Sequence, residues 1–178
     1  MFSERQIEQA VEYTAKQITE FYRNRFQTFN LSGQGASSSV LVIGILKGAV
    51  FFLTDLVRKL DFPVELDFLR VSSYGNQKQS SQSMTVTKTP DVSLANRVVL
   101  IVEDVVDSGR TVQFLREYCR QNQAEDVRIA VLIDKPQRRQ VEAPVDFVCL
   151  KATDDFLVGY GMDNAEADRN VPYIFRGE

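Results

Sequence analysis

The sequence predicts an α/β fold, in which a mainly parallel central sheet is flanked by helices on both faces. Short apolar runs, typical of buried strands, alternate with segments whose apolar residues recur at helical spacing. The chain has 178 residues, of which 44% are hydrophobic, and this is enough for one domain with a substantial core. Because there is no internal repeat and no domain boundary, residues 1–178 are predicted to form a single domain.

The first element is predicted to be an amphipathic helix over residues 2–26. Ser3 and Gln6 match a capping box, with Phe2 at the preceding staple position. The apolar residues then recur at helical spacing, at Ile7, Val11, Ile18 and Tyr22. A polar loop, NLSGQGASSS, leads to a buried strand, VLVIGIL, and a Lys-Gly turn connects that strand to a second helix, AVFFLTDLVRKL.

The second half of the chain continues the alternation. PVELDFLRVSSY is predicted to be a strand, whereas residues 75–97 offer few core candidates and are predicted to be irregular, either disordered or a functional lid. VVLIV is the strongest signal for a buried strand, and a helix, TVQFLREYCRQN, follows it with Val112, Leu115 and Cys119 at helical spacing. VRIAVLI and VDFVCL are two further strands.

Composition excludes several kinds of chemistry. The chain has no histidine and only two cysteines, Cys119 and Cys149, which are far apart and form no C-x-x-C pair. Cys/His metal sites, Ser-His triads and histidine acid-base catalysis are therefore excluded. Catalysis would have to use carboxylates, Lys, Arg, Tyr, backbone dipoles or a metal held by oxygen.

The charge and the N-terminal sequence bear on partners and location. A net charge of −3 predicts no nucleic-acid partner. The start MFSERQIEQA resembles no signal peptide, and no apolar run approaches the length of a membrane span. We therefore expect a cytoplasmic protein with no membrane partner.

Three acids follow the strand VVLIV, namely Glu103, Asp104 and Asp107. Residues just past the carboxyl end of a strand in a parallel sheet line the crevice where ligands bind. Neighbouring carboxylates suit two tasks: they accept hydrogen bonds from the vicinal hydroxyls of a sugar, and they attract a hard cation such as Mg²⁺.

The next residues, DSGRT, lead into a helix N-terminus. Free backbone N–H groups, the helix dipole and the hydroxyls of Ser108 and Thr111 would form a phosphate cradle there. The alternative is that Asp107 and Ser108 only cap the helix. GQGASS and GYGMDN lack the last glycine of G-x-G-x-x-G, and there is no Walker A sequence.

The segment VLIVEDVVDSGRT resembles, at every position, the phosphoribosyl pyrophosphate signature of the type I phosphoribosyltransferases. This resemblance implies the type I fold, with a small hood formed by the chain ends and a mobile active-site loop, here within residues 73–97. LKGAVFF, SSYG, DKP, DFLVGYGMD and DRNVPYI narrow the resemblance to the 6-oxopurine branch, over roughly residues 40–175.

The resemblance implies an Mg²⁺-dependent enzyme whose substrates are phosphoribosyl pyrophosphate and a 6-oxopurine, hypoxanthine or guanine. It also implies a homodimer or homotetramer. Lys47 and Gly48 resemble the family's pyrophosphate loop, whose backbone amides and strained peptide bond face the leaving group. Glu103 and Asp104 would hold the ribose and metal, Asp163 the metal and Arg169 the pyrophosphate. The 5-phosphate would lie on Asp107, Ser108, Gly109, Arg110 and Thr111.

On the side of the base, Asp107 resembles the catalytic acid beside the purine N7. Lys135 resembles the lysine that donates to O6, Phe156 the aromatic that stacks on the purine, and Leu157 the residue whose backbone contacts the pyrimidine edge. Ser73 and Tyr74 match the mobile loop, whose closure would exclude water.

The sequence departs from the family's pattern at Asn164 and Ala167, where an aromatic and a bulky residue are common. This puts the local packing and the preference between guanine and hypoxanthine in doubt. Two alternatives stay open: a phosphoribosyltransferase that prefers xanthine, and a non-catalytic regulator that senses phosphoribosyl pyrophosphate and binds nucleic acid.

Overall fold

The computed structural model describes residues 1–28, 39–74 and 83–177. The loop NLSGQGASSS is predicted over residues 30–39, of which residues 30–38 lie outside the described residues. The elements are α1 (Glu4–Thr28), β1 (Val40–Ile45), α2 (Val50–Val57), β2 (Val64–Tyr74), β3 (Ser83–Lys88), β4 (Val98–Val106), α3 (Arg110–Gln121), β5 (Asp126–Asp134), the 3₁₀ turn η1 (Pro136–Arg138), β6 (Phe147–Lys151), β7 (Leu157–Val158) and β8 (Phe175–Arg176).

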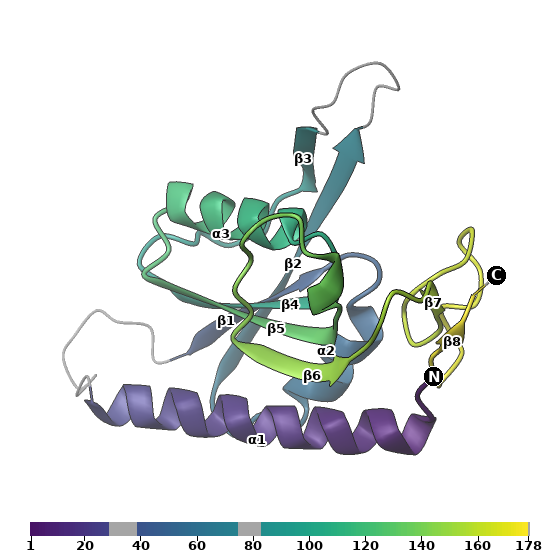
Figure 1. The fold of residues 1–178 in the computed structure, drawn as a ribbon. Coiled ribbons are helices and arrows are strands. Elements are labelled where there is room, and N and C mark those ends of the chain that lie inside the picture. Colours follow the sequence, from purple (N-terminus) through teal and green to yellow (C-terminus); the bar gives the residue numbers. More distant parts are fainter. Residues whose placement is uncertain (29–38, 75–82, 178) are drawn as a thin grey trace.

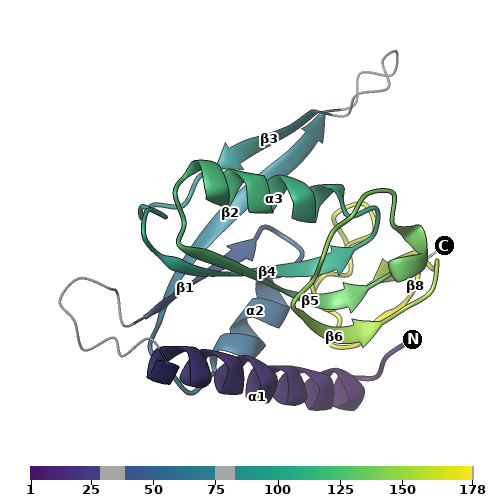
Figure 2. The ribbon, with the colours of Figure 1, turned by 60° about the vertical axis from the view of Figure 1, so that its left-hand side comes forward.

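The central sheet has the strand order β3-β2-β1-β4-β5-β6. Every neighbouring pair is parallel except β2 and β3, which form an antiparallel hairpin that extends beyond the rest of the sheet (Figures 1 and 2). Helices α1 and α2 cover one face, and α3 covers the other (Figure 2). The predicted α/β fold with a mainly parallel sheet is confirmed.

Successive residues of the central strands supply two separate cores. In β1, Val40 and Val42 pack toward α1 and α2, whereas Leu41 and Ile43 pack toward α3. A strand that is buried on both faces reads as a continuous apolar run, and this explains why VLVIGIL and VVLIV lack alternation.

The first helix begins as predicted. The backbone N–H of Ser3 donates to Gln6 Oε1 at 2.9 Å, and the N–H of Gln6 points back to Ser3 Oγ at 3.4 Å. The predicted apolar stripe of α1 is buried at all four positions, Ile7, Val11, Ile18 and Tyr22.

The two ends of the chain meet in a small hood. β7 and β8 form a two-stranded antiparallel sheet, and Phe2 exchanges two backbone hydrogen bonds of 2.9 Å with Ile174. Figure 1 shows this hood beside the N-terminus, past the carboxyl end of β6. The hood implied by the family resemblance is therefore present.

The prediction for residues 75–97 was wrong in part. Ser83–Lys88 forms strand β3, and Leu94 is buried against the core on the α3 face. β3 is an edge strand that pairs only with β2, so its sequence, SMTVTK, needs no strong apolar pattern. Residues 75–82, between β2 and β3, lie outside the described residues.

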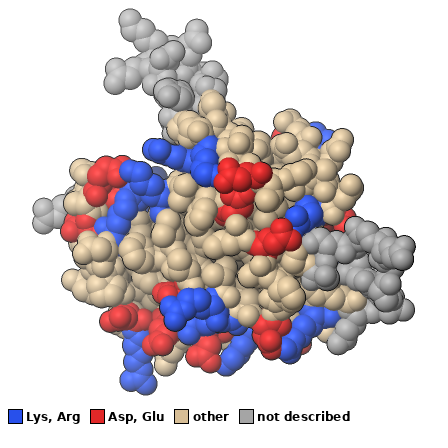
Figure 3. Space-filling view, turned by 180° about the vertical axis from the view of Figure 1, so that it is seen from behind, with Lys and Arg blue, Asp and Glu red and all other residues tan. Residues whose placement is uncertain are grey.

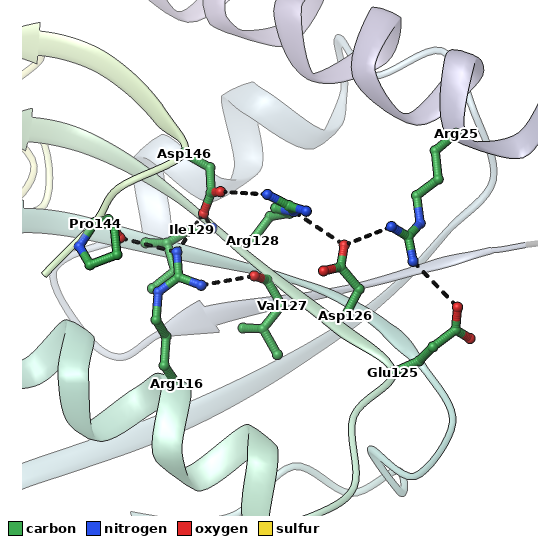
Figure 4. Close-up of polar contacts among 9 residues, drawn as sticks. All are labelled: Arg25, Arg116, Glu125, Asp126, Val127, Arg128, Ile129, Pro144 and Asp146. Atoms are coloured by element: carbon green, nitrogen blue, oxygen red, sulfur yellow. Dashed lines mark hydrogen bonds and ion pairs between the residues drawn. The ribbon is translucent and has the colours of Figure 1, made fainter. Parts of the chain in front are cut away.

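An ionic network lies at the amino-terminal edge of the sheet (Figure 4). Asp146 accepts hydrogen bonds from Arg116 at 2.6 Å, from Arg128 at 3.0 Å and from the Ile129 N–H at 2.9 Å. Asp126 extends the network from Arg128 to Arg25 of α1. The network ties α1, α3 and β5 together at the edge opposite the carboxyl ends of the strands, where ligands of such sheets bind.

The face opposite to the one shown in Figure 1 carries charges of both signs (Figure 3). Figure 3 shows basic and acidic groups lying next to one another on this face. Among the described residues, no helix combines the length and the apolar character needed to cross a membrane.

Candidate active site

A cavity of about 280 Å³ opens at the carboxyl ends of β1 and β4. Segments that are distant in the sequence line it: the turn after β1, the end of β4, the first turn of α3 and the hood. Seven residues predicted from the sequence lie on its wall, namely Lys47, Gly48, Glu103, Asp104, Thr111, Asp163 and Arg169. Larger hollows lie elsewhere, between α1 and α2 and along α3, away from these residues.

The two adjacent acids belong to β4 rather than to the loop after it, which corrects the prediction. The strand runs to Val106, and Glu103 is in register with Val131 of β5. Because the strand continues, Glu103 is 7% exposed. Burial, together with the nearby Asp104, raises the pKa of Glu103 well above its usual value.

The carboxyl of Asp104 lies against the turn after β1. Burial raises its pKa, although the Val105 N–H, which donates to Oδ1 at 2.8 Å, works in the opposite direction. A side chain at Gly48 would overlap Asp104 Oδ2. This position therefore requires glycine, so that the backbone can approach the carboxylate.

Lys47 follows a cis peptide bond from Leu46. Its Nζ contacts Glu166 Oε2 at 2.7 Å, which joins the turn after β1 to the hood. The Gly48 carbonyl lies so close to Gly161 that a side chain there would overlap it. The turn is thus held between Asp104 on one side and the hood on the other.

Arg169 is placed at the junction of the hood and the cavity. Its NH1 donates to the Gly161 carbonyl at 2.8 Å, and its NH2 lies 2.8 Å from Asp163 Oδ1 and 3.4 Å from Glu166. Lys47 and Arg169 therefore share one acidic partner, Glu166, whose pKa is lowered mainly by its hydrogen bond to Lys47. Two cations and two carboxylates meet at this end of the cavity.

Helix α3 begins at Arg110, after Gly109 in the left-handed conformation with φ of 85°. The first N–H groups of such a helix have no helical acceptor. Ser108 Oγ accepts a 3.4 Å hydrogen bond from the Arg110 N–H. Asp107 does not cap the helix: its Oδ1 instead accepts a 2.6 Å hydrogen bond from Arg138 Nε.

Lys135 follows β5 and lies beside the end of β4, because its N–H donates to the Val106 carbonyl at 3.0 Å. The residue is buried, and its Nζ donates to the Asp155 carbonyl at 2.6 Å. Phe156, which follows Asp155 in the chain, is 52% exposed, whereas Leu157 in β7 is buried. Lys135, Phe156 and Asp107 thus gather on one side of the carboxyl edge, next to the cavity.

The two residues predicted for the mobile loop lie in a strand. Ser73 and Tyr74 end β2 and pair with Met84 and Ser83 of β3. They lie at the far end of the two paired strands, next to the connecting segment 75–82, which is outside the described residues.

Asn164 and Ala167, the two positions at which the sequence departs from the family pattern, lie at the ends of a tight turn. Asn164 and Ala167 exchange backbone hydrogen bonds of 3.3 and 2.9 Å, and Ala165 and Glu166 between them have positive φ. Both departing side chains are exposed. The turn presents Glu166 to Lys47, so these positions need no bulky side chain for local packing.

Sequence reasoning missed Arg138, Arg139 and Glu166. Arg139 NH1 donates to the Val106 and Asp107 carbonyls, at 2.7 Å each, and Arg139 NH2 pairs with Asp134. A doublet of arginines shortly after a buried strand, separated from its Lys-Pro by one residue, is a signal that could have drawn attention to Arg138 and Arg139. Glu166 has no comparable local signal.

The carboxylates that line the cavity are the candidate donors to a metal ion. Among the described residues, no three Asp, Glu, Cys or His side chains cluster closely enough to form a metal site by themselves. Glu103 Oε2 is nonetheless buried without a hydrogen-bond partner. Mg²⁺ commonly takes one or two carboxylates and fills its shell with water and substrate phosphates, so the pair at the end of β4 fits such an ion.

Comparison with known proteins shows the family to which the chain belongs. The family model described as "Phosphoribosyl transferase domain" matches residues 6–165. The chain belongs to the phosphoribosyltransferase family. Its similarity to curated members extends over nearly the whole chain, and the resemblance first seen in VLIVEDVVDSGRT is confirmed.

Relatives and solved structures agree on one branch of the family. The chain is 39% identical over 174 residues to a hypoxanthine-guanine phosphoribosyltransferase of Bacillus subtilis, covering 98% of this chain and 89% of the relative. It is 36% identical to a hypoxanthine phosphoribosyltransferase of Haemophilus influenzae, with coverage of 98% and 92%. A crystal structure of a hypoxanthine-guanine phosphoribosyltransferase from Bacillus anthracis superimposes with a TM-score of 0.85 at 34% identity, covering 100% and 97%.

Proposed function

We propose that the protein transfers the 5-phosphoribosyl group of phosphoribosyl pyrophosphate to a 6-oxopurine, hypoxanthine or guanine, and so forms IMP or GMP and pyrophosphate in purine salvage. One observation carries this proposal: the turn after β1, the acids of β4, the start of α3 and the Asp163–Arg169 pair line a single cavity. The names of the relatives support the choice of base.

The cavity suits phosphoribosyl pyrophosphate. The 5-phosphate would lie on the first turn of α3, where backbone N–H groups and the dipole favour an anion, with contacts from Asp107, Ser108, Gly109, Arg110 and Thr111. Glu103 and Asp104 would accept hydrogen bonds from the ribose diol. The pyrophosphate would lie on the Lys47–Gly48 turn and Arg169, whose fork-shaped guanidinium suits phosphate oxygens.

Mg²⁺ belongs to the same proposal. Glu103 and Asp104 would hold it together with oxygens of the substrate, and Asp163 would be a ligand of Mg²⁺ bound to the pyrophosphate. The buried Glu103 Oε2, which has no hydrogen-bond partner, supports a cation at this place. Bound there, the ion would offset the charge that develops on the pyrophosphate.

The base would occupy the side of the site defined by Asp107, Lys135 and Phe156. Lys135 Nζ would donate to O6, Phe156 would stack on the purine, and the Leu157 backbone would contact the pyrimidine edge. As N9 attacks C1′, the bond from C1′ to the pyrophosphate oxygen breaks and its electron pair leaves with pyrophosphate. The N7 proton passes to the Asp107 carboxylate, which accounts for the proton released by the base.

Two further features complete the proposal. Closure of the β2–β3 hairpin, with Ser73 and Tyr74 at the far end of its paired strands, would exclude water from the reacting ribose. A homodimer or homotetramer in the cytoplasm is the proposed assembly. Phe51 of α2, which is 40% exposed close to the Lys47–Gly48 turn, supports it by supplying apolar surface for a subunit contact.

The first experiment is an ultraviolet assay with Mg²⁺ and phosphoribosyl pyrophosphate, in which hypoxanthine, guanine, xanthine and adenine are offered separately. Turnover of hypoxanthine or guanine, but not of adenine, is expected. Turnover of xanthine alone would establish the xanthine-preferring alternative. Binding of phosphoribosyl pyrophosphate without turnover of any base would refute the enzyme proposal in favour of the regulator.

Asp107→Asn separates catalysis from binding in the same assay. The variant cannot accept the N7 proton, so kcat is expected to fall by ~10²–10⁴-fold, the usual contribution of a general acid-base group. The dissociation constant for phosphoribosyl pyrophosphate should change little, because backbone groups supply most of the phosphate cradle. Unchanged kcat would remove Asp107 from the proposed chemistry.

A further inference from the structure

The side chain of Arg138 joins two carboxylates across the base side of the site. Its Nε donates to Asp107 Oδ1 at 2.6 Å, and its NH1 contacts Asp154 Oδ1. Asp107 lies in the turn between β4 and α3, whereas Asp154 lies just before Phe156 in the segment that leads to the hood. One guanidinium therefore bridges the two segments between which the base is proposed to lie.

The backbone of Asp107 is already held by other groups. Arg139 donates to its carbonyl, and the Gln140 N–H donates to the neighbouring Ser108 carbonyl at 3.0 Å. The Asp107 carboxylate is different, because it is 42% exposed and has two torsions free to rotate. Its bond to Arg138 selects one orientation, which uses Oδ1 and leaves Oδ2 for a ligand.

The 3₁₀ turn η1 sets the direction of Arg138. Lys135 directly precedes this turn, and the Arg138 N–H closes it by donating to the Lys135 carbonyl at 3.1 Å. Both reach the segment before Phe156: Lys135 Nζ bonds to the Asp155 carbonyl, and Arg138 pairs with Asp154. The turn thus delivers two cations to one short stretch of chain.

We propose that Arg138 is a positioning residue for the reaction: it orients the Asp107 carboxylate toward the purine and fastens the segment before Phe156 over the same place. This inference rests on the proposed function, in which Asp107 takes the N7 proton. Arg138 itself does not touch the reacting atoms. Its guanidinium offers several N–H groups in a fixed plane and can serve two carboxylates at once, whereas the point charge of a lysine cannot reproduce both contacts.

The effect should be on turnover rather than on folding. Arg138, Asp107 and Asp154 are all well exposed, and exposed ion pairs contribute little stability. Arg138→Gln should therefore leave Tm within about 2 °C of the wild type. By contrast, a small misplacement of a catalytic group can reduce turnover by up to about 10²-fold, so we expect kcat to fall between about 10- and 100-fold.

The test combines a kinetic split with a double-mutant cycle. Arg138→Gln should lower kcat while the KM for phosphoribosyl pyrophosphate stays within about twofold, and Arg138→Lys should recover part of the lost turnover. In the Asp107→Asn background, Arg138→Gln should change kcat by less than about twofold, because the carboxylate that it orients is already gone. The matched control is Arg176→Gln, which removes the 2.8 Å pair of Arg176 with Asp155 on the same segment and should leave kcat unchanged.

Each contrary result has a distinct meaning. Unchanged kcat in Arg138→Gln, or an equal loss in both backgrounds, would overturn the positioning role while the proposed function stands. If kcat fell as much in Arg176→Gln as in Arg138→Gln, the effect would belong to the segment before Phe156 in general, and the positioning role of Arg138 would be overturned. If Arg138→Gln did not fold, Arg138→Lys in the same cycle would decide the question. A wild-type protein without turnover would overturn both proposals.

Discussion

Glu103 lies at the centre of the site, and replacing it by glutamine should make the ligand-free protein more stable at neutral pH while removing activity. The glutamine has the same shape but cannot ionise. In the wild type, burial and the nearby Asp104 raise the pKa of Glu103, so the folded protein binds this proton more tightly than the unfolded chain does. Sites built for function often carry such a cost in stability.

The sign and size follow from proton linkage. The stabilisation by the bound proton is complete below the unfolded-state pKa of about 4.3, and it is lost as pH rises through the higher folded-state pKa. Each pH unit between the two pKa values is worth about 1.4 kcal/mol, or roughly 3–5 °C in Tm for a chain of this length. The Tm of Glu103→Gln should therefore exceed that of the wild type by an amount that grows from pH 4.5 upward.

Thermal unfolding followed by circular dichroism between pH 4.5 and 8 would measure this difference. Glu142→Gln, an exposed substitution of the same chemistry, should follow the wild type at every pH. Mg²⁺ with phosphoribosyl pyrophosphate should raise the Tm of the wild type more than that of Glu103→Gln, because the ligand stabilises only the protein that binds it. A Glu103→Gln protein that is equal to or less stable than the wild type at pH 7 would refute the reasoning.

Three other substitutions test separate parts of the structure. Lys135→Met should lower kcat/KM for hypoxanthine by about 10–150-fold, because one hydrogen bond from a charged group is lost. The dissociation constant of phosphoribosyl pyrophosphate should change little. If the affinity for phosphoribosyl pyrophosphate fell as much as kcat/KM for hypoxanthine, Lys135 would be a phosphate ligand. Glu166→Gln should lower the KM for phosphoribosyl pyrophosphate by up to about fivefold, because Lys47 and Arg169 no longer pair with an exposed carboxylate that competes with the pyrophosphate. An increased KM would contradict this. Asp67→Ala should lower Tm by about 4–8 °C at pH 7. Burial alone would raise the pKa of Asp67, but backbone N–H donors and Lys88 lower it overall. The Tm values of the variant and the wild type should therefore converge as pH falls through that lowered pKa. A Tm difference that stayed constant in acid would contradict this stabilising role of the Asp67 carboxylate.

The acidic motif could be interpreted from the sequence because it is local. Strand, acids, turn and helix start follow one another within residues 98–111, and the Cβ directions of a strand and the dipole of a helix act over such short distances. The same holds for the capping box at Ser3 and the buried stripe of α1, where helical periodicity alone selects the face. The edge strand β3 escaped this reasoning because only one neighbour and little burial constrain its side chains.

The amino-acid sequence by itself therefore determined the fold class, the family and the order of the site segments. Only the tertiary structure decided which charges meet. Lys47 and Glu166 are 119 positions apart, and Arg138 reaches Asp107 from 31 positions away. Such pairs depend on where parallel strands end and how the hood folds back over them, and no periodicity within one segment carries that information. The burial of Glu103 has the same origin, since it depends on continued pairing with β5, a partner that a single strand cannot specify.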